Sequence, residues 1–139
     1  MSIQKIHHIN FLVKELDAAI RIYTALLGGS HFTKDELSAR GALTARTRLG
    51  EQWIVLVQPT DPDSVPGRHL KAHGEGFFLM SLGVDDMESS LSDLANAGLE
   101  PTRDTDRKGL LNWWVRDLDT DQTFGAQIQL CEERLENRG

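Results

Sequence analysis

Two segments of the chain repeat the same order of hydrophobic patterns. His8–Val13 and Leu79–Val84 alternate between two faces in a way that predicts strands. Each is followed by apolar residues at helical spacing: Leu16, Ile20, Tyr23 and Leu27 in the first half, and Met87, Leu91 and Leu94 in the second. The sequence therefore contains an internal repeat that begins with a strand and an amphipathic helix.

Each half also closes on an apolar strand, Ile54–Gln58 in the first and Ile128–Glu132 in the second. The length between helix and closing strand leaves room for two more strands per half. We place these at residues His31–Lys34, Ala42–Leu49, Glu100–Arg103 and Gly109–Arg116. Asp85, with Glu88 three residues on, is the expected cap of the second helix.

The repeat predicts an α+β fold of two βαβββ modules, whose curved mixed sheets surround a cup and carry their helices on the outside. Module one covers about residues 1–59, a linker about 60–73, module two about 74–133 and a tail 134–139. Pro62, Pro66 and Gly67 lie in the linker, and we expect Thr60–Gly67 to have no regular structure. The whole chain is expected to form a single domain.

Strand residues that alternate away from the helices should line the cup. The candidate ligand-binding set is His8, Asn10, Trp53, Val55, Phe77, Leu79, Ser81, Trp113, Trp114 and Gln129, with one of the two adjacent tryptophans facing the cup. The alternation cannot say which of the two adjacent tryptophans faces inward. An apolar and aromatic lining with a few separated polar groups is typical of a small-molecule pocket. The same side chains would also suit packing against one another or against a second subunit.

Charge and cysteine content exclude some classes of function. The 139 residues carry a net charge of −6, which disfavours nucleic acid as a partner. No apolar run approaches the roughly 20 residues of a membrane span, and the first residues lack the apolar stretch of a secretory signal, so a cytoplasmic location is expected. The lone Cys131 excludes an intramolecular disulfide and a cysteine-based structural zinc site.

The residues resemble the vicinal oxygen chelate superfamily of glyoxalases, methylmalonyl-CoA epimerase, extradiol dioxygenases and bleomycin-resistance proteins. The resemblance covers nearly the whole chain. It is carried by His7–Val13, Tyr23 with Leu26-Leu27-Gly28, Val84-Asp85-Asp86, Trp114–Asp119 and Ile128–Glu132. Leu118 stands where the family's closing turn usually has proline, and Thr120–Gly125 lengthens that turn.

Metal-binding members of the family supply one ligand from each of four strands. The resemblance assigns these places to His8, Val55, Leu79 and Gln129. Valine and leucine cannot donate a lone pair, so one imidazole and one amide remain. We therefore expect no metal cofactor, with His8 and Gln129 as the residual family positions and no catalytic residue assigned. His7 and His31 receive no role.

The resemblance implies two functions. The first is a glyoxalase- or bleomycin-resistance-like protein with a degenerate metal site that binds a hydrophobic or aromatic small molecule. The alternative is a metal-dependent lyase, isomerase or dioxygenase that uses a divalent metal at a rearranged site with His8. Family members usually pair as homodimers, so we expect a homodimer with a small-molecule ligand and neither nucleic acid nor membrane as a partner.

Overall fold

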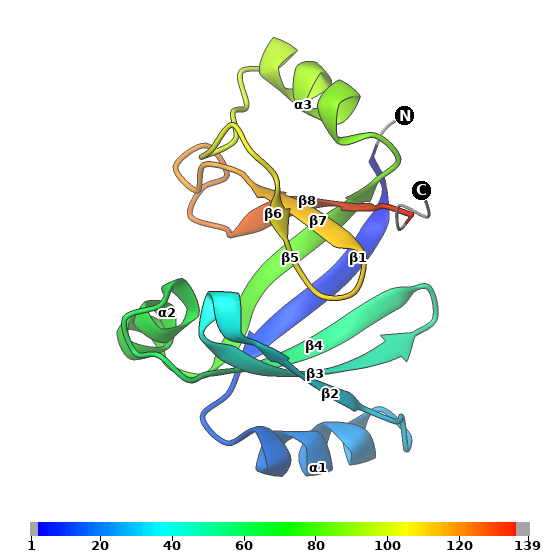
Figure 1. Cartoon of the computed structure of the whole chain (residues 1–139), viewed down its shortest axis with the longest axis vertical. Helices are drawn as coiled ribbons and strands as arrows, with labels where there is room; N and C mark the ends of the chain where they lie inside the picture. Colours follow the sequence, from blue (N-terminus) through cyan, green and yellow to red (C-terminus); the bar gives the residue numbers. More distant parts are fainter. Residues whose placement is uncertain (1–2, 136–139) are drawn as a thin grey trace. The chain divides into compact units, whose positions relative to one another are not determined.

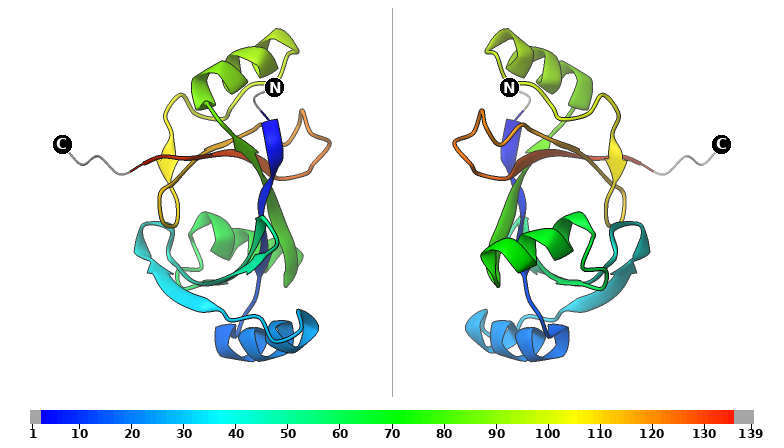
Figure 2. Two further views of the ribbon diagram at one scale, coloured as in Figure 1. Left: turned by 90° about the vertical axis from the view of Figure 1, so that its right-hand side faces the viewer. Right: turned by 90° about the vertical axis from the view of Figure 1, so that its left-hand side faces the viewer.

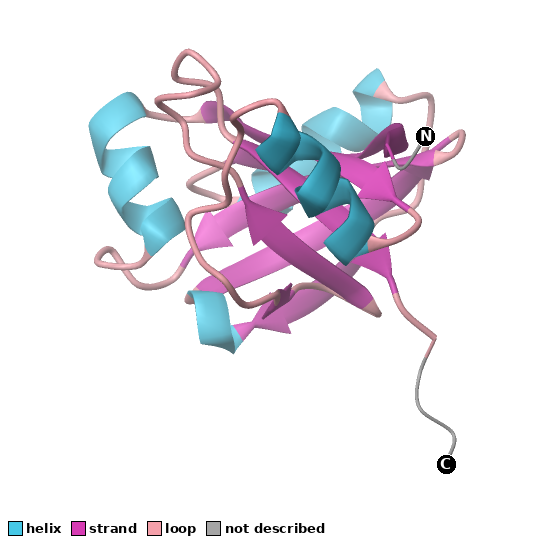
Figure 3. Ribbon diagram, turned by 90° about the horizontal axis from the view of Figure 1, so that it is seen from above, coloured by secondary structure: helices cyan, strands magenta, loops and turns pink. Residues whose placement is uncertain are grey.

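The computed structural model describes residues 3–135 (Figure 1). The first βαβββ module consists of β1 (Ile3–Leu12), α1 (Leu16–Leu26), β2 (Thr33–Leu37), β3 (Ala42–Leu49) and β4 (Gln52–Pro59), with a short 3₁₀ helix, η1 (Ser38–Arg40). The second consists of β5 (Gly76–Val84), α3 (Met87–Asn96), β6 (Arg107–Lys108), β7 (Trp113–Asp117) and β8 (Ile128–Glu133). The predicted α+β class and the two βαβββ modules are confirmed, and Figure 3 draws their helices in cyan and their strands in magenta.

The chain divides into two compact units. The first-module unit spans His8–Phe78, and the second-module unit combines the residues up to His7 with those from Leu79 onward. β1 and β5 each contribute one end to each unit. Of the expected tail, residues 136–139 lie outside the described residues. No helix among residues 3–135 is long and apolar enough to cross a membrane.

In the first-module unit the strands lie in the order β2-β3-β4-β1. β1 runs parallel to β4, and the other neighbours are antiparallel. The amphipathic helix α1 covers one face of this sheet (Figure 2), where Leu16 packs with Val13, Phe32 and Leu56. The predicted helix and the strand Ala42–Leu49 are confirmed, whereas the strand expected at His31–Lys34 lies at Thr33–Leu37.

In the second-module unit the strands lie in the order β5-β8-β7-β6, with β5 parallel to β8. Helix α3 packs its Met87 and Leu91 against Val84 and Leu130. Its N-cap is Asp86, whose carboxylate accepts a hydrogen bond from the Ser89 amide at 2.9 Å, so the expected Asp85 cap was wrong by one residue.

The strand expected at Glu100–Arg103 is absent from the described chain. Pro101 makes only an isolated bridge to Leu118, because proline has no N–H with which to extend a ladder. The two-residue β6 pairs with β7 instead, and the expected strand Gly109–Arg116 begins at Trp113.

The linker contains a helix, α2 (Val65–His73), so the expectation that Thr60–Gly67 has no regular structure was wrong from Val65 onward. The Ser64 hydroxyl accepts a hydrogen bond from the Gly67 amide at 3.1 Å, and Pro66 lies in the first turn, where its missing N–H costs nothing. A Cβ at Gly67 would lie 2.2 Å from the Asp61 carbonyl oxygen, so glycine is required there. The proline and glycine therefore start a helix rather than break one.

The two modules hold the starts of their helices in the same way. The Gln58 side-chain oxygen accepts a hydrogen bond from the Leu16 amide at 2.8 Å, and a Glu132 carboxylate oxygen accepts one from the Met87 amide at 2.7 Å. Gln58 and Glu132 occupy equivalent places in the repeated closing strands, and each partner is the first residue of its module's helix. The internal repeat thus extends to this long-range contact.

Candidate functional site

The face of the first-module sheet opposite α1 carries the candidate residues of that module. The register pairs His8 with Trp53 and Asn10 with Val55, and paired residues share a face. Leu56, of the other parity, packs under α1. We call this surface the first-module face; its members are His8, Asn10, Leu12, Thr44, Arg46, Arg48, Trp53, Val55 and Val57. The register agrees with the alternation expected from the sequence.

Polar groups on the first-module face are only partly satisfied. His8 is 3% exposed, and Val55 beside it is 1% exposed. The Asn10 Oδ1 atom is buried and has no hydrogen-bond partner among the described residues. This oxygen can therefore accept a hydrogen bond from an N–H or O–H group of a ligand.

Arginine brings positive charge to this face, which the expected lining did not include. Arg46 lies opposite Val55 in β3 and forms an ion pair with Asp35 of β2. The guanidinium groups of Arg46 and Arg48 lie 5.9 and 4.9 Å from the centre of the Trp53 ring. Both distances fall within the range of cation–π contacts. The alternation of β3 relative to β4 was the sequence signal that could have found both arginines.

The second-module unit carries a corresponding surface. Ser81 pairs with Gln129 across β5 and β8, and Asp117, Val115 and Trp113 of β7 pair with Gln129, Cys131 and Glu133 of β8. We call this set of seven residues the second-module face. Trp113 belongs to it and is 2% exposed. Trp114 has the other parity, and its ring centre lies 5.1 Å from the Arg134 guanidinium.

Side chains of the second-module face bind one another. The Gln129 amide donates a hydrogen bond to Asp117 Oδ1 at 3.0 Å, and the same carboxylate accepts from Arg107 at 3.1 Å. Gln129 is 3% exposed, so its amide group is held inside this chain of contacts. The Gln129 amide and the Asp117 carboxylate are thus engaged by protein partners, whereas the buried Ser81 Oγ, like Asn10 Oδ1, has no hydrogen-bond partner among the described residues.

His7, which received no role, is a buried part of the second-module unit. It is 2% exposed, its Nε2 lies 2.6 Å from Glu133 Oε1, and its ring meets the edge of Trp113 at 4.7 Å. A Cβ built at Gly83 would lie only 3.1 Å from Lys5 Cγ of β1 and 3.5 Å from His7 Cβ, so the glycine allows β1 to approach closely. An isolated glycine inside a strand is a signal of such close approach.

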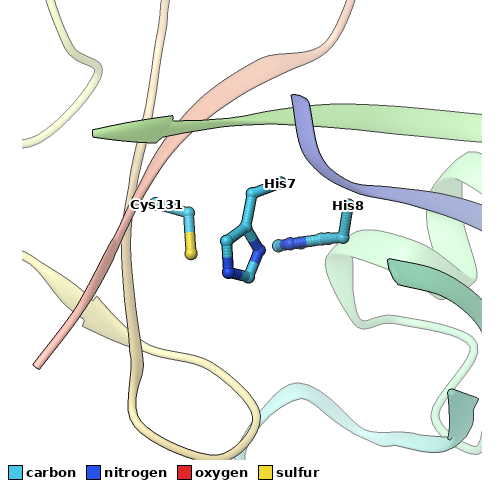
Figure 4. Close-up of side chains that lie close together, drawn as sticks. All are labelled: His7, His8 and Cys131. Carbon is cyan, nitrogen blue, oxygen red and sulfur yellow. The ribbon is translucent and has the colours of Figure 1, made fainter. Parts of the chain in front are cut away.

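Cys131 lies close to His7, with their donor atoms within 4.8 Å of one another (Figure 4). Burial, together with the negative charge of Glu133, raises the pKa of the Cys131 thiol to about 12. The thiol is therefore protonated at neutral pH and is a weak nucleophile.

The four positions that the resemblance assigns to the family's metal ligands offer few donors in this chain. Val55 and Leu79 are hydrocarbon and buried, and the Gln129 amide is bound to Asp117. His7 and Cys131 offer other donors, and His8 follows His7 along β1 (Figure 4). However, a thiol must lose its proton to bind a metal, and its burial opposes that loss.

The start of β5 departs from the expected alternation. Phe77, expected in the cup lining, is 55% exposed and meets the edge of Phe11 at 6.2 Å. The ring centre of Phe78 lies 4.8 Å from that of His69 in α2. Both residues belong to the first-module unit, so the repeat did not predict their neighbours.

Comparison with known proteins agrees with this architecture. Residues 7–115 match the family described as the glyoxalase/bleomycin resistance protein/dioxygenase superfamily. A methylmalonyl-CoA epimerase variant from Streptomyces coelicolor, solved with 2-nitronate-propionyl-CoA, superposes with a TM-score of 0.89 at 23% identity over 96% of this chain and 100% of that one. The methylmalonyl-CoA epimerase from Mycobacterium tuberculosis superposes with a TM-score of 0.89 at 24% identity, over 96% of this chain and 90% of that one.

A curated relative is also similar in sequence. The 4-hydroxyphenylpyruvate dioxygenase of Caenorhabditis briggsae is 28% identical over 135 residues, which cover 95% of this chain. This chain spans 34% of that relative's length. The match to the family over most of the chain, together with the two βαβββ modules, shows that the protein belongs to the glyoxalase/bleomycin resistance protein/dioxygenase, or vicinal oxygen chelate, superfamily.

Proposed function

We propose that this protein holds a hydrophobic or aromatic small molecule and has lost the metal site of its family. The observation that carries the proposal is Val55, which shares a face with His8 in the register of β1 and β4. A buried valine stands where a metal-binding relative needs an oxygen or nitrogen donor. Leu79 makes the same replacement in the second module.

The ligand-binding set is proposed to remain the one that the sequence indicated, with Phe77 and Trp114 removed because of their placement. Burial of a planar ligand could remove ~300 Å² of apolar surface from water, worth on the order of 7 kcal/mol before the costs of association. Micromolar binding is therefore within reach without a metal. The unpartnered Asn10 Oδ1 supplies a polar contact that would orient the ligand.

Metal analysis and ligand titration test this function together. Protein purified without chelators should carry far less than one Fe, Mn, Ni, Zn or Co ion per chain. In calorimetric titrations with planar aromatic compounds, Trp53→Ala should weaken binding, whereas Trp114→Ala should not, because Trp114 packs against Arg134 on the other face. A stoichiometric metal, or equal effects of the two substitutions, would contradict the proposal.

The alternative function, a metal-dependent lyase, isomerase or dioxygenase, would need other metal donors, and His7 and Cys131 are the candidates. Their donor atoms lie within 4.8 Å, and His8 is the next residue of the strand. If a metal binds there, His7→Ala and Cys131→Ala should each abolish its retention, and Val57→Ala should leave it unchanged. Absence of metal from the unmodified protein removes this alternative.

We further propose a homodimer, as expected from the family. Its support is the free edge strands β2 and β6, which end the sheet order and which association could cover. Light scattering behind size-exclusion chromatography should give twice the 15.6 kDa chain mass. A mass of one chain at micromolar concentration would contradict it.

A further inference from the structure

A depression of about 380 Å³ lies in the first-module unit, between the segment that follows α1 and the strands β3 and β4. Its walls include Ser30, His31, Thr33, Arg46, Arg48 and Trp53. This volume is at the lower end of the range for small-molecule sites. It suits a compact ligand or one end of a larger one.

The lining of this pocket is cationic in a chain whose net charge is −6. Two guanidinium groups and an imidazole point to an anion, and none of the lining residues is acidic. Asp35 neutralises Arg46 through their ion pair, whereas Arg48 forms no ion pair with any residue in the range 3–135. Arg48 is therefore the charge left for a ligand.

The Arg48 side chain is held in place. Its Nε donates to the Gly50 carbonyl oxygen at 3.3 Å, and its guanidinium lies 4.9 Å from the centre of the Trp53 ring. These contacts orient the exposed guanidinium group, whose two Nη atoms match the two oxygens of a carboxylate or phosphate. Fixing the donor in advance lowers the ordering cost of binding.

Two features connect the pocket to the first-module face. Arg46, Arg48 and Trp53 line the pocket and are also members of that face through the pairing of β3 with β4. Asn10 and Val55 continue the same face beyond Arg46. An anionic group at Arg48 would therefore lie at one end of the apolar surface that the proposed function assigns to the ligand.

We propose that this pocket binds the carboxylate or phosphate of a planar organic anion, with Arg48 as the specificity-determining residue. The inference rests on the proposed function, because it gives the charge of the molecule that the same face would hold. The shared chemistry is a bidentate oxyanion joined to an aromatic ring. The hydroxyls of Ser30 and Thr33 and the imidazole of His31 supply further donors around it.

The test compares an acid with its neutral amide. Titration with 2-naphthoate and 2-naphthamide is followed by calorimetry and by the three tryptophan indole N–H signals in NMR spectra, assigned with Trp53→Phe. Phenyl phosphate and inorganic phosphate, titrated in parallel, decide which oxyanion is preferred. We expect 2-naphthoate to bind about tenfold or more tightly than 2-naphthamide at low salt, and to shift the Trp53 signal.

Arg48→Gln should weaken 2-naphthoate binding by about tenfold while leaving 2-naphthamide unaffected. Arg21→Gln removes the same charge from an exposed site on α1 and should change the affinity for neither 2-naphthoate nor 2-naphthamide. Equal affinity for acid and amide, or equal effects of the two substitutions, would overturn the anion site while leaving the aromatic-ligand proposal in place. Binding of none of the four compounds at millimolar concentration would overturn both.

Discussion

The first-module face and the second-module face come from the same βαβββ repeat but treat their polar groups differently. On the first, Asn10 Oδ1 has no partner within residues 3–135. On the second, Ser81 Oγ is also buried without a partner among the described residues, but Gln129 is bound to Asp117, and His7 of the same unit is bound to Glu133. The repeat therefore determines the backbone and the helix contacts, while the side chains determine which polar groups of each face are bound to protein partners.

The largest expected effect comes from restoring the family's donors in both modules. In the triple variant Val55→Glu, Leu79→His and Gln129→Glu, the ligand set implied by the family is complete by residue type together with His8. We expect a change from no retained metal to one zinc or nickel ion per chain after dialysis, measured by elemental analysis. Without metal the buried new carboxylates should destabilise the fold, so the melting temperature should rise on metal addition.

A matched variant tests whether the position of the new carboxylate matters, or only its negative charge. Replacing Val55→Glu by Val57→Glu in the triple variant puts the carboxylate on the same face at a place the family does not use. This control should not retain metal. If both triple variants retain metal equally, or if neither retains it, position 55 is not the family's metal-ligand position.

Cys131 should make the stability of the second-module unit depend on pH. Burial raises the pKa of its thiol from 9.0 to about 12. A thiol whose pKa is higher in the folded state contributes stability that is complete below pH 9 and is lost as the pH rises toward 12. Between about pH 8 and about pH 10.5, the unfolding free energy should therefore fall about 2 kcal/mol more in the parent protein than in Cys131→Ala.

Urea unfolding at several pH values measures this difference. The equivalent residue of the first module is Val57, which does not titrate, so Val57→Ala should leave the slope unchanged. Parallel pH profiles for the parent protein and Cys131→Ala would show that the thiol titrates normally.

The helices α1 and α3, the closing strands and the β1 and β4 residues of the first-module face could be predicted from the sequence, because hydrophobic period and side-chain alternation are local properties. Trp53 and Val55 share a face with His8 and Asn10 for that reason. The start of α2 was missed because Ser64 and Pro66 suit both a turn and a helix N-terminus.

Contacts made by residues distant in the chain could not be predicted in this way. His7 pairs with Glu133, which lies 126 residues away, and alternation along one strand carries no signal for such a partner. Asp35 and Arg46 likewise meet only once the register of β2 and β3 is known. The chemistry of both faces depends on these pairs, so the sequence predicted the scaffold better than the site.

The hydrogen bonds that hold the first residues of α1 and α3 also differ between the modules. Glu132 binds the Met87 amide with a charged oxygen, and Gln58 binds the Leu16 amide with a neutral one. A negative charge at a helix N-terminus also interacts with the helix dipole. Glu132→Ala should therefore lower the free energy of unfolding by about 2 kcal/mol, and Gln58→Ala should lower it by about 1 kcal/mol. Denaturant unfolding measures both, and Glu132→Gln should fall between the parent protein and Glu132→Ala. Equal costs would show that charge adds nothing.

The smallest effect tests the contrast between the two faces directly. Asn10→Leu removes a buried oxygen that has no protein partner among the described residues, so the unfolding free energy should stay the same or rise by up to about 1 kcal/mol. Gln129→Leu removes the donor to Asp117, and should lower the unfolding free energy by about 1 kcal/mol because that carboxylate keeps Arg107 and reaches water. Opposite signs in urea unfolding would support a first-module face kept available for a ligand. If Asn10→Leu is as destabilising as Gln129→Leu, Asn10 serves the fold, and the first-module face has no polar group reserved for a ligand at that position.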